Sequence, residues 1–123
     1  MFKNPEELKY AKTHEWVKEE GGLYVIGLTD FAQDSLGDIV FVNLPSVGDE
    51  VKAGSAFGDV ESVKAVSDVY SPVTGVVKEV NDAVLDNPAA VNEDCYGAWL
   101  IKVENVTETE ELLDNKAYEE VCA

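Results

Sequence analysis

The sequence predicts a mainly β protein that folds as one domain. Short runs rich in Val, Ile, Tyr and Phe recur between turn signals built from Gly, Pro and Asn, which is typical of successive β-strands. The intervals between these runs are too short for crossover helices, so mostly antiparallel pairing is expected. A chain of 123 residues is long enough to bury one core and too short for two substantial ones. We therefore expect a single domain over residues 1–123.

A short helix is expected at the N-terminus. Asn4 has the side chain of an N-cap, Pro5 is favoured at the first helical position, and Glu6 and Glu7 place acids in the first turn. The pattern ends near Tyr10, where the strand-like part of the chain begins.

Seven segments are expected to form strands, because each combines β-branched or aromatic residues with a flanking turn signal. They are residues 15–18, 23–28, 39–43, 56–63, 65–70, 75–80 and 99–103. The fourth and fifth segments are expected to pair as a hairpin over about residues 56–70. Related turn motifs at 48–54 and 71–77 flank this hairpin, which suggests two related β halves.

Two further helices are expected. Thr29 or Asp30 can cap a short internal helix that continues to Leu36 and stops at Gly37. A C-terminal helix is expected over about residues 114–122, with apolar side chains at roughly helical spacing that would dock it on the β core. These side chains are Leu112, Leu113, Ala117, Tyr118 and Val121.

The charge of the chain excludes several classes of function. Nine basic and 25 acidic residues give a formal charge of −16, which repels a phosphate backbone and excludes binding of nucleic acid or anionic lipid. The acidity fits either solubility or steering toward basic surfaces on partners. No segment approaches the roughly 18 apolar residues of a membrane span, and no signal sequence is recognisable. We expect a monomer in a bacterial or archaeal cytoplasm, with the mitochondrial matrix as the less favoured alternative.

Metal and disulfide chemistry are not indicated. Cys95 and Cys122 lack CxxC spacing and are interpreted as free thiols. His14 is the only histidine, so no cluster of His and Cys predicts a metal site.

Lys64 is the strongest candidate for a functional residue. It is the only basic residue between Lys52 and Lys78, and it lies midway between the two arms of the expected hairpin. Its amine would then project into solvent from a stiff support. An isolated lysine at a hairpin tip is usually a solubilising charge, and the valines of the arms do not share one alternating face, so the pattern alone leaves both interpretations open.

The residues around Lys64 resemble the lipoyl-attachment region of the glycine cleavage H-protein family. Biotin carriers have Met-Lys-Met at the tip, and lipoyl domains of 2-oxoacid dehydrogenases usually have Asp-Lys-Ala, whereas this chain has Glu-Ser-Val-Lys-Ala. The resemblance continues in order along nearly the whole chain. The matching positions are Tyr10 and the segments 14–17, 27–33, 36–45, 48–54, 57–65, 67–81, 87–92, 96–103 and 117–118.

The resemblance implies a barrel-sandwich hybrid fold like that of lipoyl and biotinyl carriers, with two small antiparallel sheets. Two features depart from the family pattern. Cys95 stands where the family commonly has proline, and the segment 97–99 is one residue shorter than usual. Both changes concern the geometry of a loop, and neither touches Lys64.

The resemblance also implies a function as a carrier that is not itself an enzyme and has no catalytic residue. Lipoate would be bound covalently as N6-lipoyl-lysine at Lys64. The arm would take the aminomethyl group of glycine from glycine decarboxylase (P protein) to the aminomethyltransferase (T protein), and dihydrolipoamide dehydrogenase (L protein) would reoxidise it. Two alternatives are a lipoate relay for another pathway and an unmodified β interaction module.

Four other residues acquire roles through the resemblance. Glu61 and Gly75 would be recognised by the lipoate-attaching enzymes, although Glu61 could instead simply pair with an opposite charge. Glu15 and Asp68 would hold the loaded arm in a cleft. The alternatives are an exposed strand carboxylate for Glu15 and a hairpin-stabilising acid for Asp68. The large aromatic side chains are expected in the core, namely Trp16, Phe41 and Trp99.

Overall fold

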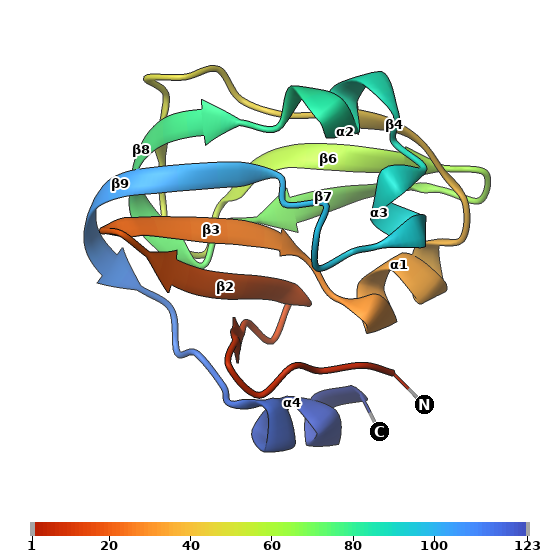
Figure 1. Cartoon of the computed structure of the whole chain (residues 1–123), viewed down its shortest axis with the longest axis horizontal. Helices are drawn as coiled ribbons and strands as arrows, with labels where there is room; N and C mark the ends of the chain where they lie inside the picture. Colours follow the sequence, from red (N-terminus) through yellow and green to blue (C-terminus); the bar gives the residue numbers. More distant parts are fainter. Residues whose placement is uncertain (1, 123) are drawn as a thin grey trace.

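The computed structural model describes residues 2–122, which form two open antiparallel sheets and four short helices (Figure 1). The larger sheet has the strand order β1-β2-β3-β9-β8-β5, and the smaller has the order β4-β6-β7. The large sheet contains β1 Lys9–Tyr10, β2 Glu15–Glu20, β3 Leu23–Leu28, β9 Ile101–Thr109, β8 Val73–Val80 and β5 Glu50–Val51. The small sheet contains β4 Ile39–Asn43, β6 Ala56–Ser62 and β7 Val66–Tyr70. The mainly β fold with two antiparallel sheets is confirmed.

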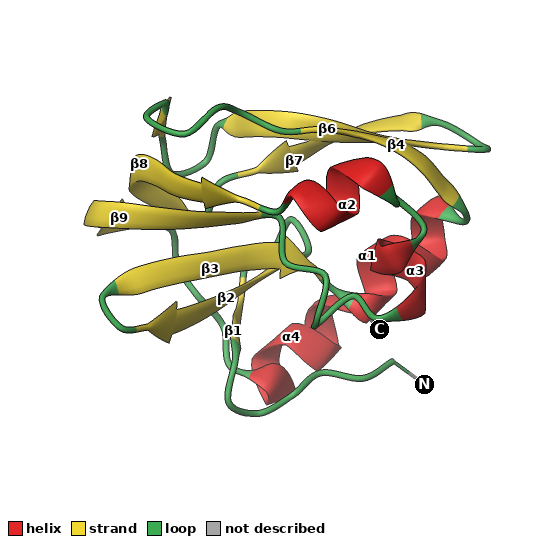
Figure 2. Ribbon diagram, turned by 45° about the horizontal axis from the view of Figure 1, so that its top comes forward, coloured by secondary structure: helices red, strands yellow, loops and turns green. Residues whose placement is uncertain are grey.

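The helices lie at one end of the two sheets and below the large one (Figure 2). They are α1 Asp30–Leu36, α2 Asp82–Asp86, α3 Ala90–Glu93 and α4 Asn115–Cys122. None of these helices is long and apolar enough to cross a membrane.

Three groups of buried apolar side chains hold the elements together. One joins the inner face of the small sheet to α1, α2 and α3, and includes Val60 and Leu100. A second lies on the large sheet around Val77 and Ile101. The third packs α4 beneath the large sheet through Tyr118. Burial of these side chains, at about 25 cal/mol per Å² of apolar surface, is the main force that holds the sheets and helices together.

All seven predicted strand segments are found. Segments 23–28 and 39–43 have the predicted ends, as β3 and β4, and the other five have shifted ends. The last one is the most different, because β9 begins at Ile101 and continues to Thr109. The two-residue strands β1 and β5 were not predicted. β5 pairs with β8, so the two related turn motifs of the sequence lie side by side: Gly48 N donates to Val77 O and Gly54 N donates to Ser71 O.

The predicted N-terminal helix is wrong. Residues 6 and 7 form a turn, and the chain then enters β1, where Tyr10 pairs with Trp16. A helix of about one and a half turns has no stability of its own in water. The extended path instead buries Tyr10 fully, stacks its ring on Tyr118 at 4.7 Å and forms a backbone bridge to Leu113.

The predicted internal helix is confirmed as α1, including both of its ends. The Thr29 hydroxyl accepts a hydrogen bond from Ala32 N at 3.2 Å, and the helix stops at Gly37. The C-terminal helix begins after Asp114, whose carboxylate accepts from Ala117 N at 2.8 Å. Helices α2 and α3 were missed, because five and four residues are too few to show a 3.6-residue repeat.

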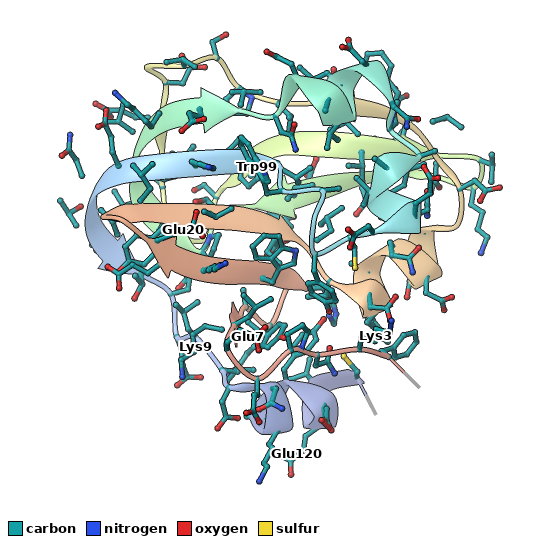
Figure 3. All side chains as sticks on the ribbon, viewed as in Figure 1. Lys3, Glu7, Lys9, Glu20, Trp99 and Glu120 are labelled. Carbon is teal, nitrogen blue, oxygen red and sulfur yellow. The ribbon has the colours of Figure 1, made fainter. Side chains whose placement is uncertain are left out.

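Four predictions about buried aromatic and apolar side chains had different outcomes. Trp16 is buried as expected. Trp99, labelled in Figure 3, is partly buried, and the Lys102 ammonium lies 4.7 Å from its ring centroid. The prediction that Phe41 belongs to the core is wrong, because half of its surface is exposed. Val121 does not dock α4 either, since it is exposed and Tyr118 makes that contact.

Candidate functional site

Lys64 lies exposed in the three-residue turn between β6 and β7. Ser62 organises this turn. Its backbone N–H donates to Ala65 O at 2.8 Å, and its hydroxyl accepts from Lys64 N and Ala65 N, each at 3.1 Å. A hydroxyl that bonds backbone groups two and three residues ahead fixes the turn locally. The lysine is therefore presented by an ordered tip.

The hairpin tip is also tied to the connection between α1 and β4. Val63 N donates to Asp38 O at 3.1 Å. The Lys64 stem lies against Gly37, where an added Cβ would be 3.3 Å from Lys64 Cε and 3.7 Å from Nζ. Gly37 has φ 79° and ψ −157°, a conformation that glycine alone adopts readily. Glycine at this position both ends α1 and leaves room for the lysine.

Asn92 on α3 forms hydrogen bonds to the same connection between α1 and β4. Its amide nitrogen donates to Gly37 O at 2.9 Å and to the Gln33 side chain at 3.0 Å. Its amide oxygen accepts from Ile39 N at 2.9 Å. One side chain thus satisfies backbone groups on both sides of the α1–β4 connection, which holds the support of Lys64 in place.

A pocket of about 130 Å³ lies beside this tip, between α1, the start of β2 and the hairpin strands. It brings together Glu15 and Asp68, the two acids that the resemblance assigned to one cleft. Its lining residues are Thr13, His14, Glu15, Leu28, Phe31, Ala32, Ser35, Leu36, Val60, Ser67, Asp68 and Val69. Gly37, under the lysine, directly follows the helix that forms one wall.

Glu15 is the buried acid of this pocket, with 1% of its surface exposed. Burial raises the pKa of its carboxyl from 4.5 to about 7. Hydrogen bonds from the Thr13 hydroxyl and from Tyr70 N, the latter at 3.3 Å, favour the ionised form and limit the rise of the pKa. The alternative that Glu15 is an exposed strand carboxylate is wrong.

Asp68 is the exposed acid of the pocket and lies directly opposite Asp59 in the hairpin. Two like charges in one cross-strand pair weaken the pairing. Asp68 therefore does not act as a hairpin-stabilising acid through this pair, and its presence beside the pocket needs another reason.

His14 lines the pocket and was not among the residues selected from the sequence. It has φ 77°, its Nδ1 lies 2.7 Å from the Tyr118 hydroxyl, and burial lowers its pKa. The same hydroxyl lies 2.7 Å from that of Thr29 at the start of α1. This chain of polar contacts connects α4, the pocket wall and α1. The position of His14 next to Glu15 was the only signal in the sequence.

Glu61 and Gly75, which we expect the lipoate-attaching enzymes to recognise, lie in different sheets. Glu61 is half-buried in β6, the strand of the small sheet that leads into the turn with Lys64. Gly75 lies in β8 of the large sheet, where an added Cβ would meet Glu104 O at 2.6 Å. Close packing against β9 is thus sufficient to explain glycine at position 75. Its role in lipoylation stays a prediction.

The fold and the site together define a class of protein. Two antiparallel sheets that present a lysine at the tip of a hairpin form the architecture of the lipoyl- and biotinyl-carrier domains. Within that class, the model of the glycine cleavage H-protein family matches residues 8–123. The chain belongs to this family.

Individual relatives agree with the family match. The chain is 58% identical over 120 residues to the glycine cleavage system H protein of Carboxydothermus hydrogenoformans, covering 95% of this chain and 92% of that protein. It is 57% identical over 126 residues to that of Halalkalibacterium halodurans, covering 100% and 98%. The crystal structure of the H protein from Mycobacterium marinum superposes with a TM-score of 0.90 at 42% identity, covering 94% and 96%.

Proposed function

We propose that this protein carries lipoate on Lys64 Nζ and transfers the aminomethyl group of glycine within the glycine cleavage system. The observation that carries the proposal is the placement of an exposed lysine, on an ordered hairpin tip, beside a pocket with a buried acid. Family membership supports the choice of lipoate over biotin. The partners would be the P, T and L proteins and the lipoate-attaching enzymes, and we expect no reaction to be catalysed by the chain alone.

The residues present fit such an arm. Lys64 offers a primary amine free for amide formation, and Gly37 leaves space for its stem. When bound, lipoate supplies a disulfide that can accept a one-carbon unit and two electrons. The chain contributes an attachment point and a high effective concentration near successive active sites.

Glu15 is suited to hold the amine of the cargo. A buried carboxylate gains most from a cationic partner, because water screens little of the interaction there. An ammonium group in the pocket would favour the ionised form of Glu15 and offset the desolvation that raises its pKa. Thr13 and Tyr70 N keep both carboxylate oxygens oriented toward fixed donors. Asp68 would add a second negative charge from its exposed position at the same pocket.

Intact mass and glycine–bicarbonate exchange test the proposal. After expression with lipoate and a lipoate ligase, the native chain should gain one lipoyl mass at Lys64 and support exchange with the P protein. Lys64→Arg should gain no mass and support no exchange. Lipoylation at another lysine, or exchange supported by Lys64→Arg, would contradict the proposal.

Release of the cargo tests the pocket separately. Glu15→Ala and Asp68→Ala should each shorten the half-life of the aminomethyl-loaded form, measured as released ammonia or formaldehyde. Lys9→Ala changes a charged residue on β1 outside the pocket and serves as the control. An unchanged half-life would remove the corresponding acid from the pocket's function. A slower lipoylation rate of Glu61→Gln would support its recognition by the attaching enzyme.

A further inference from the structure

Tyr118 on α4 contacts both walls of the pocket and is not itself one of its lining residues. Its hydroxyl lies 2.7 Å from His14 Nδ1 and 2.7 Å from Thr29 Oγ1. His14 belongs to the wall that also provides Glu15, and Thr29 caps α1, which forms another wall. Helix α4 lies below β2 and α1 in Figure 1. One buried hydroxyl from the C-terminal helix therefore links the two walls.

The hydrogen bonds around this hydroxyl have a definite direction. Thr29 is fully buried, and its oxygen already accepts from Ala32 N at 3.2 Å. The Thr29 proton finds an acceptor in the Tyr118 oxygen, so Tyr118 donates its own proton to His14 Nδ1. In the reverse direction the buried Thr29 proton would have no acceptor among residues 2–122. A ring nitrogen that accepts carries no proton, so His14 is assigned as neutral with its proton on Nε2.

His14 has a backbone conformation that needs support from other segments. Its φ of 77° lies in the left-handed region, which residues other than glycine occupy at a cost in free energy. Its backbone N donates to Ala11 O at 3.0 Å, and its O accepts from Thr29 N at 3.2 Å. Its ring contacts Tyr118 and lies 4.6 Å from the ring of Phe31, measured between centroids. Helices α1 and α4 together thus hold the backbone and the ring of His14.

The conformation of His14 sets the position of Glu15. Thr13 and Glu15 flank His14 in the sequence, and both line the pocket. The Thr13 hydroxyl donates to the Glu15 carboxylate, so a rotation of the backbone at His14 would displace this donor relative to its acceptor. A displacement of about 1 Å is enough to weaken a positioned contact strongly. The contact between Glu15 and an ammonium group in the pocket would therefore depend on how firmly His14 is held.

We propose that the Tyr118 hydroxyl is a positioning group for the pocket: it holds the His14 ring as the Nε2–H tautomer and ties it to Thr29 at the start of α1. This inference rests on the proposed function of the pocket. Tyr118 does not contact the cargo and acts through His14 and Thr29. Without its hydroxyl, the buried Thr29 proton and His14 Nδ1 lose their common partner, and the two walls are no longer tied at this point.

Nitrogen NMR tests the tautomer in the native protein. His14 is the only histidine of the chain, so a tag-free sample gives one pair of imidazole nitrogen resonances. At a pH above the ordinary pKa of histidine, Nδ1 should have the shift of an unprotonated nitrogen and Nε2 that of a protonated one. A proton on Nδ1 under these conditions would overturn the proposal. This measurement needs neither lipoate nor a variant.

Two Tyr→Phe variants separate positioning from general stability. Tyr118→Phe removes the hydroxyl and keeps the ring that stacks on Tyr10 at 4.7 Å. Tyr10→Phe is the matched control, because it removes a hydroxyl from the same stack that donates to Pro5 O at 2.6 Å. Both tyrosines are fully buried, so both variants should lose stability in urea. Only Tyr118→Phe should shift the His14 nitrogen resonances toward a mixture of the two neutral tautomers.

The half-life of the aminomethyl-loaded form measures the effect on the cargo. After lipoylation and loading, Tyr118→Phe should shorten this half-life about fivefold, the loss expected for one hydrogen bond, and Tyr10→Phe should keep the native value. Thr29→Val removes the other hydroxyl and should also shorten it, whereas Thr29→Ser should not. Equal half-lives within either pair of variants would overturn the positioning role. A native loaded form that decays as fast as free aminomethyl-lipoamide would overturn the proposed function of the pocket, and this inference with it.

Discussion

Glu15→Gln is expected to reduce the pH dependence of the protein's stability. Glutamine has nearly the shape of a protonated glutamic acid and keeps one acceptor and one donor group. It can therefore accept the hydrogen bond from Thr13 or from Tyr70 N. The substitution removes the ionisation and leaves the packing of this buried position nearly unchanged.

The raised pKa of Glu15 sets the direction and size of the effect. Between pH 4.5 and about 7 the native state keeps a proton that the unfolded chain has released, so the free energy of unfolding falls as the pH rises. A shift of about 2.5 pKa units at about 1.4 kcal/mol per unit corresponds to roughly 3 kcal/mol. Native Glu15 is thus expected to lose about 3 kcal/mol relative to Glu15→Gln as the pH increases from 4.5 to 8. Most of this loss occurs below pH 7.

Urea unfolding at pH 5, 6, 7 and 8 measures the difference. The stability of Glu15→Gln minus that of the native protein should increase with pH and level off above about 7. Val47→Thr, at an exposed and uncharged position, should differ from the native protein by a constant amount. A constant difference for Glu15→Gln as well would refute the argument that burial raises the pKa of this carboxyl.

Two other substitutions test the support of the site. Tyr118→Phe removes the hydroxyl that lies 2.7 Å from the Thr29 hydroxyl. Because the buried Thr29 hydroxyl then loses a partner, the free energy of unfolding in urea should fall by about 1–3 kcal/mol. A free energy of unfolding equal to that of the native protein would contradict this. Gly37→Ala should cost about 1–3 kcal/mol through backbone strain and also slow lipoylation of Lys64, as measured by intact mass over time. Gly22→Ala is the control, because Gly22 also has a positive φ of 83° and no atom lies within 4 Å of the added Cβ. It should lower the free energy of unfolding without slowing lipoylation. Equal lipoylation rates for Gly37→Ala and Gly22→Ala would contradict a role of Gly37 in placing the lysine.

Local signals in the chain were sufficient for much of the fold. Helix α1 has its cap at Thr29 and its stop at Gly37, and both act through groups within a few residues. The hairpin around Lys64 was predictable because strand-forming residues flank a turn on both sides. The N-terminal helix had comparable local signals and does not form, because Tyr10 is stabilised by Trp16, Leu113 and Tyr118.

In the candidate site, too, some features were predictable from the sequence and others depend on tertiary contacts. The sequence by itself predicted seven of the nine strands of residues 2–122 and the hairpin that carries Lys64, and its family motifs indicated lipoate as the cofactor that this lysine would carry. The resemblance placed Glu15 and Asp68 in one cleft, but only the tertiary structure decided that Glu15 is buried while Asp68 is exposed, and that Phe41 is exposed near Lys64. The reason is that burial and the pKa depend on which distant segments pack together. Strand and turn preferences act between neighbours, whereas the surroundings of a carboxyl are set by residues 55 positions away, as between Glu15 and Tyr70.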